Sequence, residues 1–491
     1  MEEQSKEILT FDVGTTSVKV SLFSAHMEPL DSRVVEYALD TGGCQVSVDA
    51  AVYCKAICEG VRALGPCGQV AAIGLTTQGE TIIPVDELGA PLGPAIVWLD
   101  SRAEKQAQAL RGQLSGAEFY EATGLPEITG ALPLAKLAWL RQCEPLLFEK
   151  TYKFLLLEDF LLHWLAGVFV TEQSLATSTG WFCLREGIYW QKALDAAGVP
   201  LQKLPPLVRC GQAVGGLLPG PAALLGLAQG IPVCTGAMDQ TAAALAAGGV
   251  RPGVVTETTG TAHVVAACTD APVFAAGHRV TIYRHALDGL YLYLPIGNTA
   301  GMALKWFRQQ FGRPEESYAA LDEAAAAVPA GCEGLVFLPY LAGGSVDPDN
   351  CPGATACFFG ARLSTTRGHF IRAILEATGY ELRAFLAQLE QLGCRADEVV
   401  ALGGGARSAL WMQLKADICQ RALAVPHWAE ATSTGAALLA AWGAGLVPRG
   451  EYPPSLRQGV VLYRPNPGTA GAYDGQYARY TALYQAVRPL F

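Results

Sequence analysis

Charged side chains are scarce in this 491-residue chain: Asp, Glu, Lys and Arg make up only 16% of it, whereas apolar residues make up 51%. So low a charge content excludes an intrinsically disordered chain and predicts large buried cores. The 35 basic residues are outnumbered by 45 acidic ones, which gives a formal net charge of −10. We therefore expect no nucleic-acid partner, because proteins that bind nucleic acids carry a basic surface.

The 14 cysteines contain no CxxC pair, and the closest two are Cys54 and Cys58. Scattered cysteines are typical neither of a disulfide framework nor of a zinc cluster. The acidic start of the sequence also lacks the features of a signal peptide. We therefore expect reduced thiols in a cytoplasmic protein.

A long membrane-spanning run is missing as well. The most apolar stretch, 154–170, contains Glu158, Asp159 and His163. Charges in the middle of a span are costly in a bilayer, so we expect a buried helix here and no membrane partner.

Motifs of several well-known catalytic sites are absent. The sequence has no HExxH, no GxSxG, no GxxxxGK[ST] and no GxGxxG after its first strand, and its seven histidines form no cluster. We therefore expect no metal site built from protein ligands alone and no nucleotide site of the Walker A type.

Short apolar strands alternate with helical segments along the chain, which predicts an α/β fold. The first strand, 8–13, leads through a Gly-Thr-Thr-Ser turn into a second strand at 18–23. A similar strand, Thr/Gly turn and strand recur at 254–267, about half a chain later. This recurrence indicates two domains of similar topology, which we place at residues 1–249 and 250–491.

Both turns carry groups suited to a polyphosphate. Asp12 ends the first strand, and the turn after it contains Thr15 and Thr16; the second turn contains Gly260 and Thr261. Turn N–H groups and hydroxyls can hold phosphate oxygens, and Mg²⁺ needs few protein carboxylates because phosphates and water complete its shell. The alternative is a pair of ordinary hairpin turns without a ligand.

Two further loops follow strands. Asp239 and Gln240 come after the strand at 231–234 and open an alanine-rich helix, at the edge where α/β sheets bind ligands. Asp239 there suits a general base for a substrate hydroxyl, or it is only a helix N-cap. The glycine run 403–405 opens the helix at 407–419, and it either admits a flat base or ribose or makes a tight connection.

A group of polar residues and a tryptophan, the polar cluster, lies at the ends of two strands in the first half of the chain. Its members are Gln78, Glu80, Trp98, Asp100 and Arg102. A ring that packs against carbon and acceptors that face hydroxyls are suited to a polyol. The alternative is a surface ion pair between Asp100 and Arg102 beside a core tryptophan.

Four collinear motifs resemble those of the FGGY family of carbohydrate kinases, which includes xylulokinase, gluconokinase and glycerol kinase. They are Asp12-x-Gly-Thr-Thr-Ser, Val85-Asp-x-x-Gly-x-Pro-Leu-x-Pro-Ala-Ile-x-Trp-x-Asp-x-Arg102, Gly403-Gly-Gly-Ala-Arg-Ser-x-Leu-Trp411 and Ala429-Glu-Ala-x-x-x-Gly-Ala-Ala-Leu-Leu439. The resemblance implies an α/β fold of two actin-like (ribonuclease H-like) ATPase domains flanking a deep interdomain cleft. It also implies ATP-dependent, Mg²⁺-requiring phosphorylation of a sugar hydroxyl, and we add a homodimer as an expectation.

The resemblance further implies roles by position. Asp239 matches the proton acceptor, and Asp12 matches the acid near the phosphates, which would hold Mg²⁺ through water. The positions that match nucleotide-binding residues are Thr15, Thr16, Gly260, Thr261, Gly301, Lys305, Gly404 and Gly405. The positions that match substrate-binding residues are Gln78, Gly79, Glu80, Trp98 and Gln240.

The substrate residues depart from the family patterns. Gln78-Gly79-Glu80 is neither the Gln-Met-His of xylulokinases nor the Gln-Arg-Glu of glycerol kinases, and Ala131 stands about where glycerol kinases carry an aromatic residue. We expect a ketose such as xylulose as the substrate, with glycerol or another polyol as the alternative. The alternatives outside the kinases are an ATPase and a sugar sensor of the same superfold.

Overall fold

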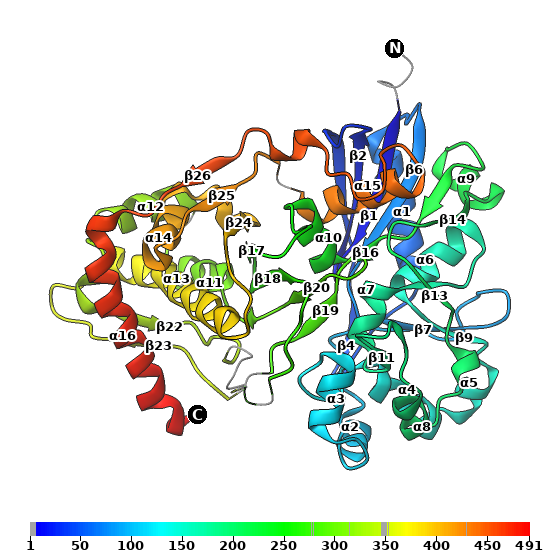
Figure 1. The fold of residues 1–491 in the computed structure, drawn as a ribbon, viewed down its shortest axis with the longest axis horizontal. Helices are drawn as coiled ribbons and strands as arrows, with labels where there is room; N and C mark the ends of the chain where they lie inside the picture. The colour runs from blue at the N-terminus through cyan, green and yellow to red at the C-terminus, as the bar shows by residue number, and fades with distance from the viewer. Residues whose placement is uncertain are drawn as a thin grey trace. The chain divides into compact units, whose positions relative to one another are not determined.

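Figure 1 shows the computed structural model of the chain, which describes residues 6–491 apart from 276, 278, 314, 345–350, 352 and 429. Ala429, the first residue of the fourth motif, therefore lies outside the described residues. The chain forms two compact units, each with its own sheet. Unit 1 comprises Met1–Gly248, Thr281–Leu292 and Glu430–Leu456, and unit 2 comprises Gly249–Val280, Tyr293–Ala429 and Arg457–Phe491.

The main sheet of unit 1 has the strand order β14-β15-β6-β1-β2-β3, and β16 also pairs with β6. The strands β1, β2 and β3 form an antiparallel meander, whereas β6 runs parallel to β1. The strand bounds are β1 (Glu7–Val13), β2 (Ser17–Ser24), β3 (Pro29–Glu36), β6 (Val70–Thr77), β14 (Ala213–Gly216), β15 (Pro232–Cys234) and β16 (Ala237–Met238).

A second, smaller sheet of unit 1 has the order β4-β5-β8-β7-β9. Its strands are β4 (Asp40–Gly42), β5 (Gln45–Val48), β7 (Ile82–Val85), β8 (Ala95–Ile96) and β9 (Lys153–Leu156). β9 lies at the start of the apolar stretch for which we expected a helix alone, and the helix α6 (Leu157–Ala166) follows it directly. Both elements are largely buried, so the apolar run serves the core of unit 1.

Helices cover the strands of unit 1. They are α1 (Ala51–Leu64), α2 (Glu104–Arg111), α3 (Gly116–Thr123), α4 (Pro133–Cys143), α5 (Pro145–Lys150), α6, α7 (Gln173–Ala176), α8 (Gln191–Ala197), α9 (Pro219–Leu225), α10 (Asp239–Ala246) and α15 (Ala431–Gly443). The segment Thr281–Leu292 carries β19 (Ile282–Arg284) and most of β20 (Tyr291–Tyr293).

The helix α15 explains why unit 1 differs from a contiguous domain at 1–249. Its small residues pack directly on α10, and a Cβ atom added to Gly435 would lie 2.0 Å from the carbonyl oxygen of Ala242. Such a close approach is open only to glycine. A helix from near residue 440 is thus built into the core of the unit that contains the N-terminal strands.

Unit 2 repeats the strand arrangement of unit 1. β17 (Val254–Thr259) and β18 (His263–Thr269) are antiparallel, and β24 (Glu398–Leu402) runs parallel to β17, as β6 does to β1. The sheet continues to β25 (Leu423–Val425) and β26 (Val461–Tyr463), and β21 (Ile296–Gly297) pairs with β18. Its helices are α11 (Gly301–Phe311), α12 (Tyr318–Ala326), α13 (Arg367–Gln391), α14 (Ala409–Cys419) and α16 (Ala470–Val487).

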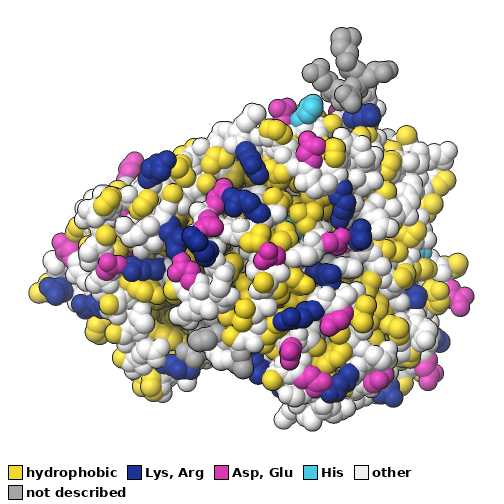
Figure 2. Space-filling model, in the orientation of Figure 1, with side chains coloured by type: hydrophobic (Ala, Val, Ile, Leu, Met, Phe, Trp, Pro, Cys, Tyr) yellow, Lys and Arg dark blue, Asp and Glu magenta, His cyan; other side chains and the backbone are white. Residues whose placement is uncertain are grey.

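Within the described ranges no helix combines the length and the apolar character that crossing a membrane requires. All 14 cysteines carry free thiols. On the face drawn in Figure 2, Lys and Arg side chains are interspersed with Asp and Glu side chains.

Candidate active site

Three neighbouring strands bring Asp12 and Asp239 to the same end of the main sheet of unit 1. Asp12 of β1 is paired with Thr76 of β6, and Thr76 is paired with Ala237 of β16. Asp239 follows two residues after Ala237 as the first residue of α10. The N-cap of this helix is Met238, so the alternative that Asp239 is only an N-cap is wrong. Asp239 Oδ1 accepts a hydrogen bond from the Gln240 N–H at 2.6 Å.

The two carboxyl groups are close enough to influence each other. Burial raises the pKa of Asp239 to about 7, and the charge of Asp12 adds to this effect. Burial also raises the pKa of Asp12, whereas a hydrogen bond from the Thr432 hydroxyl and the Lys19 ammonium act in the opposite direction. Two neighbouring, half-buried acids with raised pKa values are a setting that a divalent cation stabilises.

Thr15 links the first turn to the polar cluster. Its hydroxyl accepts a hydrogen bond from Trp98 Nε1 at 2.9 Å and donates one to Gln78 Oε1 at 2.9 Å. The structure thus joins one predicted nucleotide residue to two predicted substrate residues, while Thr16 is exposed in the same turn. Trp98 is 38% exposed, so it is not the core tryptophan of the alternative interpretation.

Glu80 lies in the left-handed region of the backbone, with φ of 64°, which is unusual for a residue with a side chain. The buried Lys136 stabilises this backbone conformation, because Lys136 Nζ donates hydrogen bonds to the carbonyl oxygens of Glu80 at 3.2 Å and Val97 at 2.9 Å. Burial raises the pKa of Glu80 to about 7; Lys136 opposes this shift and Asp239 adds to it. Burial first, and then Glu80 and Asp239, also raise the pKa of Tyr283. These side chains therefore share one neighbourhood.

Gly79 has little free space around it. A Cβ atom at this position would lie 3.0 Å from Ser178 Oγ and 3.4 Å from Met238 Sδ. Gln240, the remaining predicted substrate residue, is half-buried next to Asp239. A residue with the bulk of Met or Arg would not fit at position 79 without movement of its neighbours.

Asp100 and Arg102 form the ion pair of the alternative interpretation, but they form it inside the protein. Asp100 Oδ2 accepts Arg102 Nη2 at 2.6 Å and the Val46 N–H at 2.6 Å, and Asp100 is fully buried. The guanidinium carbon of Arg102 lies 5.0 Å from the ring centroid of Trp139. The Asp100 carboxylate is thus occupied by protein donors, and the pair supports the loop that carries Trp98.

A pocket of about 620 Å³ lies entirely within unit 2. All the predicted nucleotide residues of the second half line it, namely Gly260, Thr261, Gly301, Lys305, Gly404 and Gly405. Further lining residues that sequence reasoning missed are Tyr318, Asp322, Arg407, Ser408 and Trp411. Its volume is within the range of small-molecule sites.

Backbone contacts hold the glycine segments of this pocket together. The Gly301 N–H donates to the Gly260 carbonyl at 2.8 Å, and the Ala300 N–H donates to the Thr261 carbonyl at 2.9 Å. A Cβ atom on Gly405 would lie 2.6 Å from Thr259 Cγ2. Three segments distant in sequence are thereby fixed around one cavity.

Sequence reasoning missed three residues of unit 1 that contact the predicted ones: Lys136, Tyr283 and Thr432. Lys136 is a lone lysine on the buried part of the helix Pro133–Cys143, and that isolation was a detectable feature. Tyr283 comes from a distant segment without a motif, and Thr432 stands at an unspecified position of the fourth motif, so neither was assigned to the site. Among the described residues no group of three or more His, Cys, Asp or Glu side chains could hold a metal ion.

Comparison with known proteins agrees with this architecture. The chain is similar to a gluconokinase of Bacillus subtilis (strain 168), with 29% identity over 90% of this chain and 88% of the relative. It is also similar to a xylulose kinase of the same organism, with 27% identity over 90% and 89%. The solved xylulose kinase from Rhodospirillum rubrum superposes with a TM-score of 0.89 and 29% identity over 99% of each chain. The expected two-domain α/β fold is thereby confirmed.

Two family models cover nearly the whole chain. The N-terminal domain of the FGGY family of carbohydrate kinases matches residues 7–246, and its C-terminal domain matches residues 255–444. These matches follow the order in which the units begin along the sequence, and the relatives named above are sugar kinases. The chain belongs to the FGGY family of carbohydrate kinases and is a phosphotransferase of the gluconokinase and xylulokinase type.

Proposed function

We propose that this kinase transfers the γ-phosphate of ATP to a hydroxyl group of a small ketose, with Asp239 as the general base. The observation that carries the proposal is the half-buried carboxyl of Asp239 at the end of β16, whose pKa is raised to about 7 by loss of solvent and by the charge of Asp12. A base that titrates near neutral pH accepts a hydroxyl proton more effectively than an ordinary aspartate. Asp239 also lies near Glu80 and Tyr283, which offer an acceptor and a hydroxyl to a polar substrate.

The pocket of unit 2 supports ATP as the phosphate donor. Trp411 and Met302 give it an apolar surface, whereas Lys305 and Arg407 bring cations to its lining. Thr261, in the turn after Gly260, adds a hydroxyl. Adenosine needs the first kind of surface and a polyphosphate needs the second. FGGY kinases use ATP, which agrees with this division.

Asp12 is the residue that fits Mg²⁺ in this proposal. Its half-buried carboxyl has a raised pKa and lies near a second acid, so a cation there would offset the repulsion between the two groups. When bound, Mg²⁺ would neutralise charge on the phosphate oxygens. Thr432, whose hydroxyl donates to Asp12 Oδ2, orients the carboxylate independently of the metal.

The substrate site favours an uncharged sugar over an aldonate. Glu80 and Asp239 are both acids, and a substrate carboxylate placed between them would be repelled wherever either is ionised. Trp98 offers part of its ring to solvent, and a ring of this kind packs against the carbon face of a sugar. Gluconate is the second candidate, because a gluconokinase is among the similar relatives; glycerol and other polyols are the third.

The test is release of ADP with a panel of D-xylulose, L-xylulose, D-ribulose, glycerol and gluconate. We expect the highest kcat/KM with a ketose. Asp239→Asn is expected to lower kcat about 10²–10⁴-fold, the range for loss of a general base, while ADP still binds. Turnover near that of the unmodified enzyme would remove Asp239 from this role. ADP release that no sugar stimulates would favour an ATPase, and sugar binding without turnover would favour a sensor.

A cytoplasmic location, a homodimer and the boundary near residue 250 stay predictions from the sequence. The assignments of Thr15, Thr16, Gly260, Thr261, Gly301, Lys305, Gly404 and Gly405 to the nucleotide are part of this proposal. So are those of Gln78, Gly79, Glu80, Trp98 and Gln240 to the sugar.

A further inference from the structure

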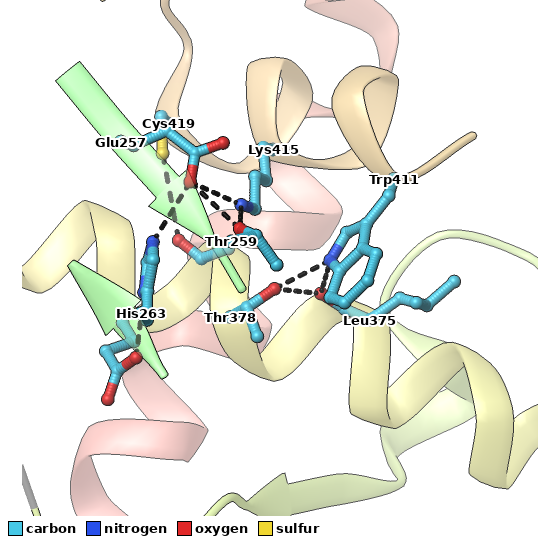
Figure 3. A network of polar contacts seen from close by, with 10 residues as sticks. Glu257, Thr259, His263, Leu375, Thr378, Trp411, Lys415 and Cys419 are labelled. Carbon is cyan, nitrogen blue, oxygen red and sulfur yellow. Dashed lines mark hydrogen bonds and ion pairs between the residues drawn. The ribbon is translucent and has the colours of Figure 1, made fainter. Parts of the chain in front are cut away.

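A network of buried charged side chains lies next to the turn at Gly260 and Thr261 in unit 2 (Figure 3). Lys415 of α14 is fully buried, and its Nζ donates to Glu257 Oε2 at 2.7 Å and to Thr259 Oγ1. Thr259 Oγ1 donates in turn to the same Glu257 oxygen at 3.0 Å. The Thr259 hydroxyl is therefore fixed both as an acceptor and as a donor.

His263, the first residue of β18, extends this network. Its Nδ1 lies 2.8 Å from Glu381 Oε2, and its Nε2 lies 3.2 Å from Glu257 Oε2. Although burial alone would raise the pKa of Glu257, Lys415 and His263 lower it to about 2, so Glu257 is a carboxylate at neutral pH. Two acids thus face two bases in the interior, and removal of one member leaves an uncompensated charge.

The network touches the nucleotide pocket through two of its lining residues. Thr259 lines the pocket next to Gly260 and Thr261. Trp411 also lines it and lies one helical turn before Lys415 on α14, with the Lys415 ammonium 5.6 Å from its ring centroid. Lys415 itself is not among the lining residues. One buried cation therefore connects the turn to the helix that supports the pocket.

We infer that Lys415 is a positioning residue for the nucleotide phosphates, an inference that rests on the proposed function because the pocket must hold ATP. The ammonium of Lys415 fixes the Thr259 hydroxyl and, through it, the turn at Gly260 and Thr261, whose Thr261 lines the pocket with a hydroxyl donor. Donors held in place before the ligand arrives stabilise its charge without reorganisation. A merely structural ion pair would stabilise unit 2 but would not distinguish a phosphate from a nucleoside.

The experiment measures binding of ADP and of adenosine by titration calorimetry, with adenosine measured by displacement of ADP. Lys415→Met removes the ammonium and keeps an unbranched stem. We expect the Kd for ADP to rise about tenfold, as for one misplaced charge-assisted hydrogen bond, and the Kd for adenosine to change less than about twofold. In turnover assays the KM for ATP should rise while the KM for the sugar stays the same.

Arg372→Met is the matched control. Arg372 is buried in the same unit, its Nε donates to Glu376 Oε1 at 2.7 Å, and neither residue lines the pocket. Loss of this ion pair is expected to lower the Tm without changing the ratio of the ADP and adenosine affinities. The Lys415 variant should change that ratio, which loss of stability alone does not do.

Thr259 provides a second test if the Lys415 variant does not fold. Thr259→Val removes the hydroxyl at nearly constant volume and should weaken ADP binding, whereas Thr259→Ser keeps the hydroxyl and should bind ADP more tightly than the Val variant. If both single variants fold, the double variant Lys415→Met/Thr259→Val should bind ADP no more weakly than either single variant does.

Three results would overturn the inference: an unchanged ADP affinity in Lys415→Met, equal losses for ADP and adenosine, or equal ADP affinities in the Val and Ser variants. Failure of the part of the proposed function on which the inference rests, ATP in the pocket of unit 2, is distinguishable from these results, because the unmodified protein would then bind neither adenosine nor ADP.

Discussion

The raised pKa of Asp239 predicts a steep loss of activity at acidic pH. A general base accepts a proton only in its ionised form, and a raised pKa means that this form is lost as the pH falls through about 7. At pH 5 such a group is about 1% ionised, so kcat/KM should be about 100-fold below its plateau. An aspartate with an ordinary pKa of about 3.9 would stay more than about 90% ionised at that pH.

The assay is ADP release from pH 5 to pH 8.5, analysed as kcat/KM because that ratio reports ionisation of the enzyme before the substrate binds. Two variants identify the group responsible. Asp12→Asn should move the midpoint to lower pH, because the Asp12 charge contributes to raising the pKa of Asp239. Glu80→Gln should keep an acid limb, although Glu80 itself titrates near 7.

A profile that is flat between pH 5 and pH 8 would refute the reasoning, since Asp239 would then ionise like a solvated aspartate. An acid limb that disappears in Glu80→Gln would also refute it and would assign the titration to Glu80.

Three further changes test other parts of the structure. Asp12→Asn should raise the Mg²⁺ concentration for half-maximal activity about 10–100-fold, and an unchanged titration would argue against a metal role. Thr15→Val removes the hydrogen bonds to Trp98 and Gln78, at ~1 kcal/mol each, so the KM for the sugar should rise, whereas Thr15→Ser should restore it. Gly435→Ala should lower stability by ~1–3 kcal/mol because its methyl group meets Ala242, and thermal unfolding measures the loss. Gly475→Ala on α16 is its control: nothing lies within 4 Å, so the Tm should stay or rise, and equal losses would contradict the packing argument.

Local patterns sufficed to predict many elements. The strand–turn–strand units at 8–23 and 254–267 are confirmed as β1–β2 and β17–β18, because each alternates apolar residues around a short polar turn. The helix expected at 407–419 is present as α14 (Ala409–Cys419). Asp12 and Asp239 were found at strand ends for the same reason: polar residues directly after a buried strand stand out.

Other features depend on contacts that no local pattern records. No local pattern indicates that α15 packs on α10, because this packing depends on the space around Gly435, which only the folded chain defines. The edge strand β3 (Pro29–Glu36) was missed because its polar and apolar residues leave it largely exposed. Tyr283 reaches Glu80 across about 200 residues of sequence, and only tertiary structure makes that proximity visible.

The discontinuous make-up of unit 1 has a consequence for synthesis of the protein. Its N-terminal strands emerge from the ribosome first, but α15 ends only at Gly443 of 491 residues. Contacts of such long sequence separation form late and slowly. The nascent first half therefore has to persist with an uncovered apolar face until Gly443, the last residue of α15, has been translated.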